Sequence, residues 1–436
     1  MNIFFLYYTG TLSTTMIPYL LQVFAVLSLL CCSTTAQSYN DTNTLINDLM
    51  GTYTSKVRPV ETVSEVLNIS LTFYLSSIIS FDEQEESLTT AGYLRIMWKD
   101  RSLVWQTSQY NGVAMMFVPQ DDIWKPDISL RNSFSTFTGL GSSYQNVIVE
   151  NDGTVYWDPF QVMKSTCSVD ITYYPYDTQQ CTIKLIAWSY LKSDVNLLSQ
   201  SGIIKSHYSE SSTWKLVKST FQADNSEVAS ISYTLMLERK PRFYVFNMIL
   251  PVILLSILNL FTFVLPLSSG ERASYGITVF LALVVFLTIV AAEFPKNSDT
   301  TSHLAVWLIL MVSISTLAVI LTIIEARLLS RDDGNHEIGK FYRRFYGIVM
   351  FLQCRSCKSH VHRVKSKAAT SKQSVMSSDT EDELYLDLKW KNITDAMDYV
   401  FFFGIVFFVI LVTLIMLLTL IYNPDKVTEE YKSSQL

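Results

Sequence analysis

The sequence predicts an extracellular antiparallel β-sandwich of immunoglobulin-like type fused to a four-helix transmembrane bundle. Two observations support this fold class: short alternating apolar segments in the first half and four long apolar runs in the second. The chain has 436 residues, of which 49% are hydrophobic, and a mean hydropathy of +0.24. Such a composition indicates that part of the chain leaves water. The net charge of -6 gives no reason to expect a nucleic-acid partner.

Residues 1–36 are expected to form a secretory signal peptide. They contain no Lys or Arg, run apolar over residues 17–32 and end in small residues at Ala36, where cleavage is expected. Because the basic leader is missing, an uncleaved anchor is the alternative. A signal peptide would place the following segment in an oxidising compartment.

Residues 37–242 are expected to form the sandwich. Segments such as 231–237 alternate apolar and polar residues, and turn sequences such as Asn-Asp-Gly at 151–153 separate them. This pattern is typical of short antiparallel strands in a two-sheet domain. Asn40 and Asn68 begin Asn-x-Ser/Thr sequons, so we expect glycosylation there if the domain is secreted.

Four apolar runs follow the predicted sandwich, at residues 243–265, 275–292, 304–324 and 400–421. Each approaches the ~20 residues that an α-helix needs to cross a ~30 Å hydrocarbon layer. We therefore expect three transmembrane helices within 243–326 and a fourth helix with an extracellular tail within 397–436. Four crossings place both chain ends on the same side of the membrane.

Residues 327–396 are expected to form a cytoplasmic loop with an amphipathic helix. Residues 327–372 hold eleven Lys or Arg against three Asp or Glu. An excess of basic residues beside transmembrane helices is typical of the cytoplasmic side. The predicted domain organisation is thus an outer sandwich, a membrane bundle and an inner loop.

Two cysteines, Cys167 and Cys181, remain in the predicted sandwich after signal cleavage, and they are expected to pair. A disulfide that closes a ring of about fifteen residues removes on the order of 3 kcal/mol of unfolded-chain entropy. The ring has Tyr174-Pro175-Tyr176-Asp177 at its centre, and the aromatic-Pro pair is a candidate cis bond. By itself, this segment could also be an ordinary stapled hairpin.

Several aromatic and charged motifs occur in a fixed order around this ring: Trp98-Lys99-Asp100 with Trp105, Trp124-Lys125-Pro126-Asp127, Trp188-Ser189-Tyr190, Arg239, Gly270-Glu271-Arg272, and Trp390-Lys391 with Asp398. Together with the Cys-x13-Cys spacing, this order resembles the Cys-loop receptors, the pentameric ligand-gated channels that include nicotinic, serotonin, glycine and GABA types. The resemblance spans nearly the whole chain. It implies a pentamer, no cofactor and no catalytic or metal site.

The resemblance also implies a set of residues that couple the outer domain to the membrane helices. In the family, the tip of the disulfide ring rests on the loop between the second and third crossings, and an acidic and a basic residue clamp the two domains. The matching positions here are Tyr174, Pro175, Tyr176, Asp177, Arg239 and Pro295.

The second apolar run is where an ion path is expected. Helical spacing puts seven residues on one stripe: Glu271, Ser274, Thr278, Leu281, Val285, Thr288 and Ala292. Such a stripe of small and hydroxyl residues could also be a helix-packing face. However, a carboxylate at a membrane boundary is costly unless it meets water or cations.

Five copies of Glu271 would form an acidic ring, and five Leu281 side chains would form a constriction that gates by dewetting. Anion-selective members of the family resemble one another in a Pro-Ala pair before the basic residue, where this chain has Gly270-Glu271. The resemblance therefore implies selectivity for monovalent cations. Ala292 stands where cationic relatives usually carry an acid, which leaves calcium permeability open.

The ligand site implied by the resemblance lies between neighbouring sandwiches, in an aromatic box. The matching or neighbouring positions are Tyr93, Arg95, Arg131, Tyr156, Asp158, Trp188 and Tyr190. Each ring of such a box attracts a cationic amine by roughly 0.5 to 2 kcal/mol. Arg131, however, replaces the usual tyrosine, and the hairpin at 222–230 lacks vicinal cysteines and aromatics.

Acetylcholine is therefore a doubtful agonist, and an anionic, zwitterionic or larger amphipathic ligand fits Arg95 and Arg131 at least as well. The alternative is that these arginines are solvated or paired with Asp158 and Glu227. Overall, we expect the chain to be a subunit of a homo- or heteropentameric cation channel in the plasma membrane. There it would contact membrane lipid and have a postsynaptic role. The alternative is an accessory or non-conducting subunit without a competent agonist pocket.

Overall fold

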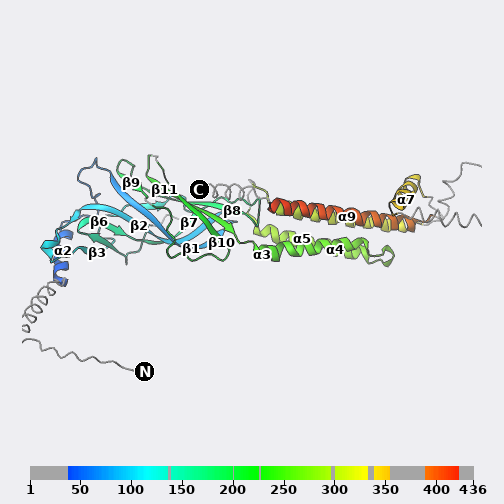
Figure 1. Ribbon diagram of the computed structural model, residues 1–436, viewed down its shortest axis with the longest axis horizontal. Coiled ribbons are helices and arrows are strands. Elements are labelled where there is room, and N and C mark those ends of the chain that lie inside the picture. Colours follow the sequence, from blue (N-terminus) through cyan, green and yellow to red (C-terminus); the bar gives the residue numbers. More distant parts are fainter. Residues whose placement is uncertain are drawn as a thin grey trace, which may run out of the picture.

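The computed structural model describes residues 38–135, 139–199, 201–224, 227–295, 300–331, 338–353 and 388–421. The expected signal peptide of residues 1–36, the expected tail beyond residue 421 and residues 354–387 of the expected loop lie outside the described residues. Figure 1 shows a sheet-rich domain at one end of the long axis and a helical bundle at the other.

The sheet-rich domain begins with the helix α2 (Tyr39–Met50), whose first turn is closed by a capping box between Ser38 and Asp41. Eleven strands then follow among the described residues: β1 (Leu67–Asp82), β2 (Ser87–Val104), β3 (Met115–Pro119), β4 (Ile128–Leu130), β5 (Asn146–Glu150), β6 (Asp152–Trp157), β7 (Phe160–Thr166), β8 (Thr178–Ala187), β9 (Val195–Leu198), β10 (Trp214–Asp224) and β11 (Ser230–Arg239). A short 3-10 helix, η1 (Thr107–Tyr110), lies between β2 and β3.

The strands form two sheets. One sheet has the order β3-β5-β6-β2-β1-β9, with β7 also paired to β2, and the other has the order β10-β11-β8-β4. The long pair β1 and β2 runs antiparallel from Ser70 opposite Met97 to Asp82 opposite Ser87. Every second residue of β11 is buried, as the alternating sequence predicts for a strand with one face in a core.

The two sheets enclose a common core. Ile231 and Leu235 on β11 are fully buried against residues of β1 such as Phe73, whose ring lies 5.9 Å from the ring of Tyr233. The hydroxyl of Tyr233 donates a hydrogen bond to the carbonyl of Leu71 on the opposite sheet at 3.0 Å. The predicted β-sandwich is therefore confirmed.

Within the described residues, four helical segments are long and apolar enough to cross a membrane: Arg242–Phe263, Arg272–Glu293, His303–Leu329 and Trp390–Ile421. The first of them joins α3 (Arg242–Tyr244), the π-helical turn η2 (Val245–Ile249), α4 (Leu250–Leu260) and η3 (Phe261–Phe263). Pro251 has no N–H to bond the preceding turn, which accounts for the local π-helical turn. The other three are α5 (Arg272–Glu293), α6 (His303–Leu329) and α9 (Trp390–Ile421). The predicted four-helix bundle is confirmed.

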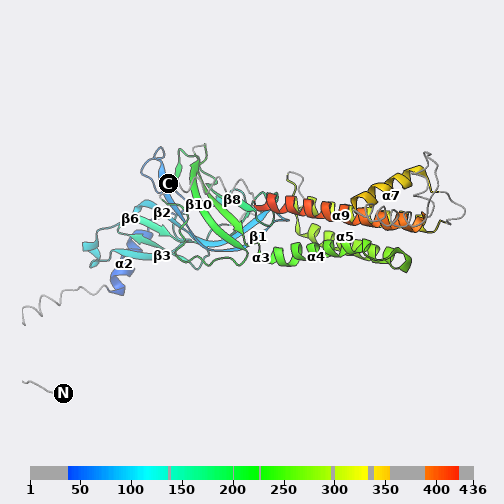
Figure 2. The same ribbon diagram turned by 45° about the vertical axis from the view of Figure 1, so that its right-hand side comes forward.

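The short helix η4 (Leu267–Ser269) connects the first two segments. The helix α7 (Lys340–Leu352) lies beside the end of α9 that is farther from the sandwich, as Figure 2 shows. The rings of Tyr342 and Trp390 meet there at 5.3 Å, edge to face. The fourth segment begins ten positions before the apolar run at residues 400–421, because its first turns pack in this small cluster.

The two predicted glycosylation residues lie in regular structure. Asn40 is exposed in the first turn of α2, and Asn68 is exposed in β1, where its Oδ1 accepts a hydrogen bond from Asn196 at 3.2 Å. The amide nitrogen of Asn68, which would carry a glycan, takes no part in that bond. Glycosylation of both residues stays a prediction.

Candidate functional site

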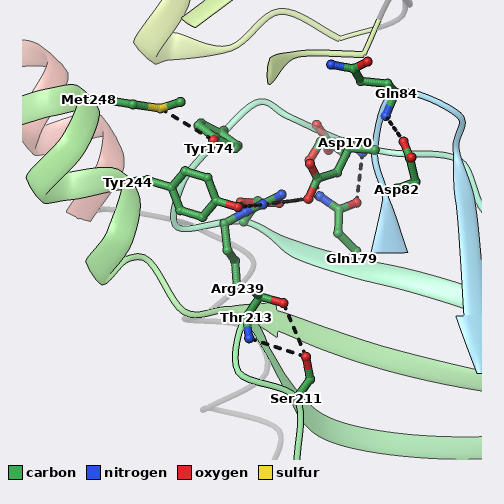
Figure 3. A network of polar contacts seen from close by, with 12 residues as sticks. Asp82, Gln84, Asp170, Tyr174, Gln179, Ser211, Thr213, Arg239, Tyr244 and Met248 are labelled. Carbon is green, nitrogen blue, oxygen red and sulfur yellow. Dashed lines mark hydrogen bonds and ion pairs between the residues drawn. The ribbon is translucent and has the colours of Figure 1, made fainter. Parts of the chain in front are cut away.

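An arginine clamp lies where the sandwich meets the helices. Arg239, the last residue of β11, is buried, and its Nε and Nη2 donate to the two carboxylate oxygens of Asp177 at 2.7 and 3.0 Å. Its Nη1 donates to Glu83 at 2.7 Å and to the hydroxyl of Tyr244 at 3.2 Å. Gln179 also donates to Asp177, at 2.6 Å. Figure 3 shows Arg239 with Tyr244, Tyr174 and Gln179 around it.

The clamp is enclosed by aromatic rings. The Arg239 guanidinium lies 4.4 Å from the ring centroid of Trp214, 4.7 Å from that of Tyr174 and 5.1 Å from that of Tyr244. A buried charge is costly unless it is paired and hydrogen-bonded, and the bidentate carboxylate meets that need. Burial lowers the pKa of Arg239, but Asp177 and Glu83 outweigh burial and raise it, so the guanidinium stays charged.

Glu83 illustrates the opposing effects of this environment. Burial raises the pKa of the Glu83 carboxyl, although the nearby Arg239 guanidinium lowers it. The sequence predicted the roles of Asp177 and Arg239 but missed Glu83 and Trp214. Both lie in strand-end segments whose proximity to Arg239 depends on how the two sheets pack.

The disulfide ring inserts an aromatic side chain between the two domains. Cys167 and Cys181 are bonded, and the Tyr174–Pro175 peptide bond at the centre of the ring is cis. The ring of Tyr174 meets those of Tyr244 and Phe294 edge to face, at 5.2 and 5.0 Å. Its hydroxyl lies 3.8 Å from the sulfur of Met248 (Figure 3).

Further contacts join the same ring to the start of α6. The N–H of His303 donates to the carbonyl of Thr172 at 3.1 Å, and the rings of Tyr173 and His303 lie 5.5 Å apart. The N–H of Ile171 donates to the hydroxyl of Thr300 at 3.5 Å. In addition, Gln84 in the β1–β2 turn donates to the carbonyl of Ala292 near the end of α5.

These contacts place the predicted coupling residues at one junction. Tyr174, Pro175 and Asp177 are buried in it, Tyr176 is half-buried, and Pro295 is buried at the end of α5. The direct aromatic partner of the disulfide ring is Phe294 rather than Pro295. Phe294 is visible in the sequence as an aromatic residue directly before Pro295. The direction of its side chain, however, depends on how α5 ends.

The seven residues predicted to line an ion path share one exposed face, formed by Glu271 at the N-cap of α5 and by six residues of α5 itself. All of them are exposed in this single chain, and Leu281 in the middle is 58% exposed. The opposite face is buried against the other helices through Gly276, Val279, Leu283 and Val290. The stripe therefore points away from the chain's own bundle.

One half of the predicted ligand residues lies on the β4–β8 sheet. Trp188 follows β8 and is 59% exposed, and its backbone N–H donates to the backbone carbonyl of Asp127. Tyr190 is half-buried, and its hydroxyl accepts a hydrogen bond from the indole of Trp124 at 3.4 Å. Arg131 is exposed just after β4, and within the described ranges it forms no ion pair, so the expected alternative of a pair with Glu227 is not observed.

The other half lies on the β2–β6 sheet, where a tyrosine stack meets an ion pair. Tyr93 stacks on Tyr74 with ring centroids 4.5 Å apart. Arg95 forms a bidentate ion pair with Asp158, with nitrogen-oxygen distances of 3.0 and 2.7 Å. The hydrogen bonds to Asp158 raise the pKa of Arg95 above its usual value. For Arg95, the alternative of pairing with Asp158 is the one observed.

Tyr74 was missed by the sequence analysis, although it lies on β1 directly opposite Tyr93. The guanidinium of Arg95 lies 5.4 Å from the ring centroid of Tyr74. Tyr156, on β6, donates its hydroxyl to Glu150 at 3.5 Å. The predicted ligand residues thus belong to two different sheets. Those on the β4–β8 side and those on the β2–β6 side form two separate groups within one chain.

Comparisons with known proteins agree with this geometry. A sequence model described as the neurotransmitter-gated ion-channel ligand binding domain matches residues 42–241, and one described as the transmembrane region of such channels matches residues 248–387. The chain is 31% identical to the acetylcholine receptor subunit gamma of Mus musculus over 74% of its own length and 65% of the relative's.

Two further relatives have similar sequence identity to this chain. Identity is 30% to the acetylcholine receptor subunit gamma of Rattus norvegicus, over 77% of this chain and 68% of the relative. It is 34% to the neuronal acetylcholine receptor subunit alpha-9 of Homo sapiens, over 58% of this chain and 55% of the relative. The chain therefore spans between 55% and 68% of the lengths of these three relatives.

Proposed function

Because this chain belongs to the neurotransmitter-gated ion-channel family, we propose that it is one subunit of a pentameric cation channel opened by an extracellular ligand. The observation that carries this proposal is the exposed stripe on α5, which begins at Glu271 and passes through Leu281. A carboxylate and hydroxyl groups on one side of a membrane helix are costly against lipid. They become favourable when several copies enclose a water-filled path.

Residues at different positions along the stripe have different roles. A ring of Glu271 carboxylates concentrates cations at one mouth, and a ring of Leu281 side chains excludes water midway when the path is closed. The hydroxyls of Ser274 and Thr278 lie between them on the exposed face. This arrangement supports cation transport.

Opening is proposed to pass through the junction around Tyr174 and Arg239. Ligand binding shifts the sandwich between two arrangements, and the buried clamp moves with it. Tyr174 touches both the first membrane segment and Phe294 at the end of α5. A displacement of the disulfide ring is therefore passed to the helix that lines the path.

The ligand is proposed to bind between the β4–β8 face of one subunit and the β2–β6 face of its neighbour. Trp188 and Arg131 are exposed on the first face, and Tyr93 with the Arg95–Asp158 pair lies on the second. The relatives are acetylcholine receptor subunits by name. For this chain, the exposed Arg131 favours an anionic, zwitterionic or larger amphipathic ligand, because its guanidinium repels an ammonium group.

We place the channel in the plasma membrane, with the sandwich and the C-terminus outside and the segment between α6 and α9 inside. The Cys167–Cys181 disulfide supports an outer location for the sandwich, because such bonds persist in oxidising compartments. Assembly with related subunits or with copies of itself, and a postsynaptic role, belong to the same proposal.

Voltage-clamp recording from cells that display the chain at the surface, alone and with related subunits, tests the proposal. The expected result is a current whose reversal potential follows the cation gradient. Replacing external sodium with an impermeant organic cation should abolish the inward component. Electrical silence from surface pentamers in every combination would instead support a non-conducting scaffold.

A further inference from the structure

Arg272 follows Glu271 directly in the sequence, but the two side chains point in different directions. Glu271 is exposed at the start of the α5 stripe, whereas Arg272 is 1% exposed. Consecutive helix residues are turned by about 100° relative to each other, which allows this divergence. The positive charge is therefore directed into the subunit's own bundle.

Two carboxylates from other membrane segments form ion pairs with the Arg272 guanidinium. Its Nη2 lies 2.9 Å from Oε2 of Glu325 on α6, and its Nη1 lies 2.5 Å from Oδ1 of Asp398 on α9. The ring of Phe263, at the end of the first segment, lies 4.7 Å from the guanidinium carbon. Glu325 is fully buried, and the Asp398 side chain is 19% exposed.

This arrangement does more than bury a charge. A cation in the first turn of a helix is unfavourable, because the helix dipole is positive there. An arginine directed into the path would also oppose the field of the neighbouring Glu271 carboxylate. Buried carboxylates hold a guanidinium firmly, because breaking a buried pair leaves an uncompensated charge.

We propose that Asp398 and Glu325, which lie outside the ion path, are positioning residues for cation selectivity. They hold Arg272 away from the path and compensate its charge, so that Glu271 sets the potential at that mouth. Removing the Asp398 carboxylate makes the cluster one charge more positive, and removing the Arg272 guanidinium makes it one charge more negative. This inference rests on the proposed channel function.

A purely structural role predicts something different. If the cluster only anchors α9 to α5 and α6, its loss lowers assembly or surface display and leaves the conductance of the remaining channels unchanged. If the cluster sets the potential, conductance follows its net charge. Ion conduction through single channels separates these two roles, because it is independent of the number of channels.

The test uses full-length chains in the Leu281→Thr background, which is expected to open without ligand. The variants are Asp398→Asn, Arg272→Gln and the double variant with both changes. Asp395→Asn is the matched control, because Asp395 is exposed one turn away on α9. The measurements are single-channel slope conductance for sodium and the shift in reversal potential when external salt is diluted.

The expected order of conductance follows the net charge of the cluster. Asp398→Asn should lower inward conductance about twofold and reduce the preference for cations over chloride. The double variant should return to the parent value, and Arg272→Gln should equal or exceed it. Asp395→Asn should change conductance by less than about 20%, because water and salt screen an exposed charge.

Two outcomes would overturn the inference while the channel proposal stands. One is unchanged conductance in Asp398→Asn; the other is a double variant that stays as low as Asp398→Asn alone. If Asp398→Asn does not reach the surface, conductance of Arg272→Gln below the parent value overturns it equally. If the Leu281→Thr parent itself carries no current at the surface, the channel proposal fails.

Discussion

The rings of Tyr174 and Phe294 meet edge to face, with centroids 5.0 Å apart. Tyr174 belongs to the disulfide ring of the sandwich, and Phe294 directly follows the last residue of α5. The contact therefore joins the domain proposed to bind ligand to the helix proposed to line the path. Its geometry is that of a favourable aromatic pair.

Replacing Phe294 with Ala should weaken opening. The lost edge-to-face contact is worth about 0.5 to 1.5 kcal/mol beyond simple burial, which corresponds to roughly a 2- to 13-fold change in the opening equilibrium. Single-channel open probability in the Leu281→Thr background measures this change. Phe294→Tyr keeps the ring and serves as the control.

A double-mutant cycle with Tyr174→Leu tests whether the contact itself is responsible. The effects of Phe294→Ala and Tyr174→Leu should be less than additive, because either change alone removes the ring pair. Strict additivity would show that the two residues influence opening independently, contrary to the proposed route.

Arg239→Gln should prevent most of the protein from reaching the cell surface. It leaves the Asp177 carboxylate buried without its bidentate partner, and breaking a buried pair costs about 3 to 5 kcal/mol. Surface biotinylation with total-protein controls measures the loss. Arg239→Lys should rescue little, because an ammonium group cannot bond both carboxylate oxygens and Glu83 in the same planar geometry.

A second change at the clamp provides a sharper test. Combining Arg239→Gln with Asp177→Asn removes both charges and should recover part of the surface display. Equal loss in the single and double variants would indicate that packing among Trp214, Tyr174 and Tyr244, rather than the ion pair, dominates at this junction.

Leu281→Thr should produce current without ligand. A hydroxyl at the constriction lets water enter, and a wetted path conducts. Whole-cell recording of holding current, with removal of permeant cations, checks this result. Leu283→Thr is the matched control, because Leu283 lies on the buried face of the same helix and is 2% exposed.

Leu283→Thr should lower surface display without increasing resting current, since it places a hydroxyl in the packed bundle. If Leu283→Thr opened the channel and Leu281→Thr did not, the face of α5 that lines the path would have been assigned wrongly.

Arg95→Gln should change ligand preference more than it changes stability. The Arg95–Asp158 pair is partly exposed, so its loss should destabilise the domain by less than about 1 kcal/mol. It also leaves the Asp158 carboxylate uncompensated at the proposed interface. Binding of tetramethylammonium to the purified full-length assembly should therefore strengthen, while thermal stability stays nearly constant.

Arg101→Gln is the matched control for this experiment. Arg101 also lies on β2 and also pairs with carboxylates, those of Glu61 and Glu65, but it is not among the predicted ligand residues. Tetramethylammonium affinity should not change in Arg101→Gln. An equal gain in both variants would point to a general effect of net charge.

Sequence patterns were sufficient for the large features of the fold. A run of about twenty apolar residues has few alternatives to a membrane helix, because every backbone polar group must be bonded within the lipid. Alternation over residues 231–237 likewise predicts a strand with one buried face, which β11 shows. Local periodicity carries this information, so no long-range contact had to be known.

The sequence by itself determined that the chain has a sandwich, four membrane helices and a carboxylate-led stripe on the second helix. Only the tertiary structure decided where the arginines point. Arg272 turns to Glu325 and Asp398, and Arg95 turns to Asp158, across distances of many residues along the chain. A charge is stabilised by whichever opposite charge folding brings within a few ångströms, and periodicity within one segment contains no information about those partners.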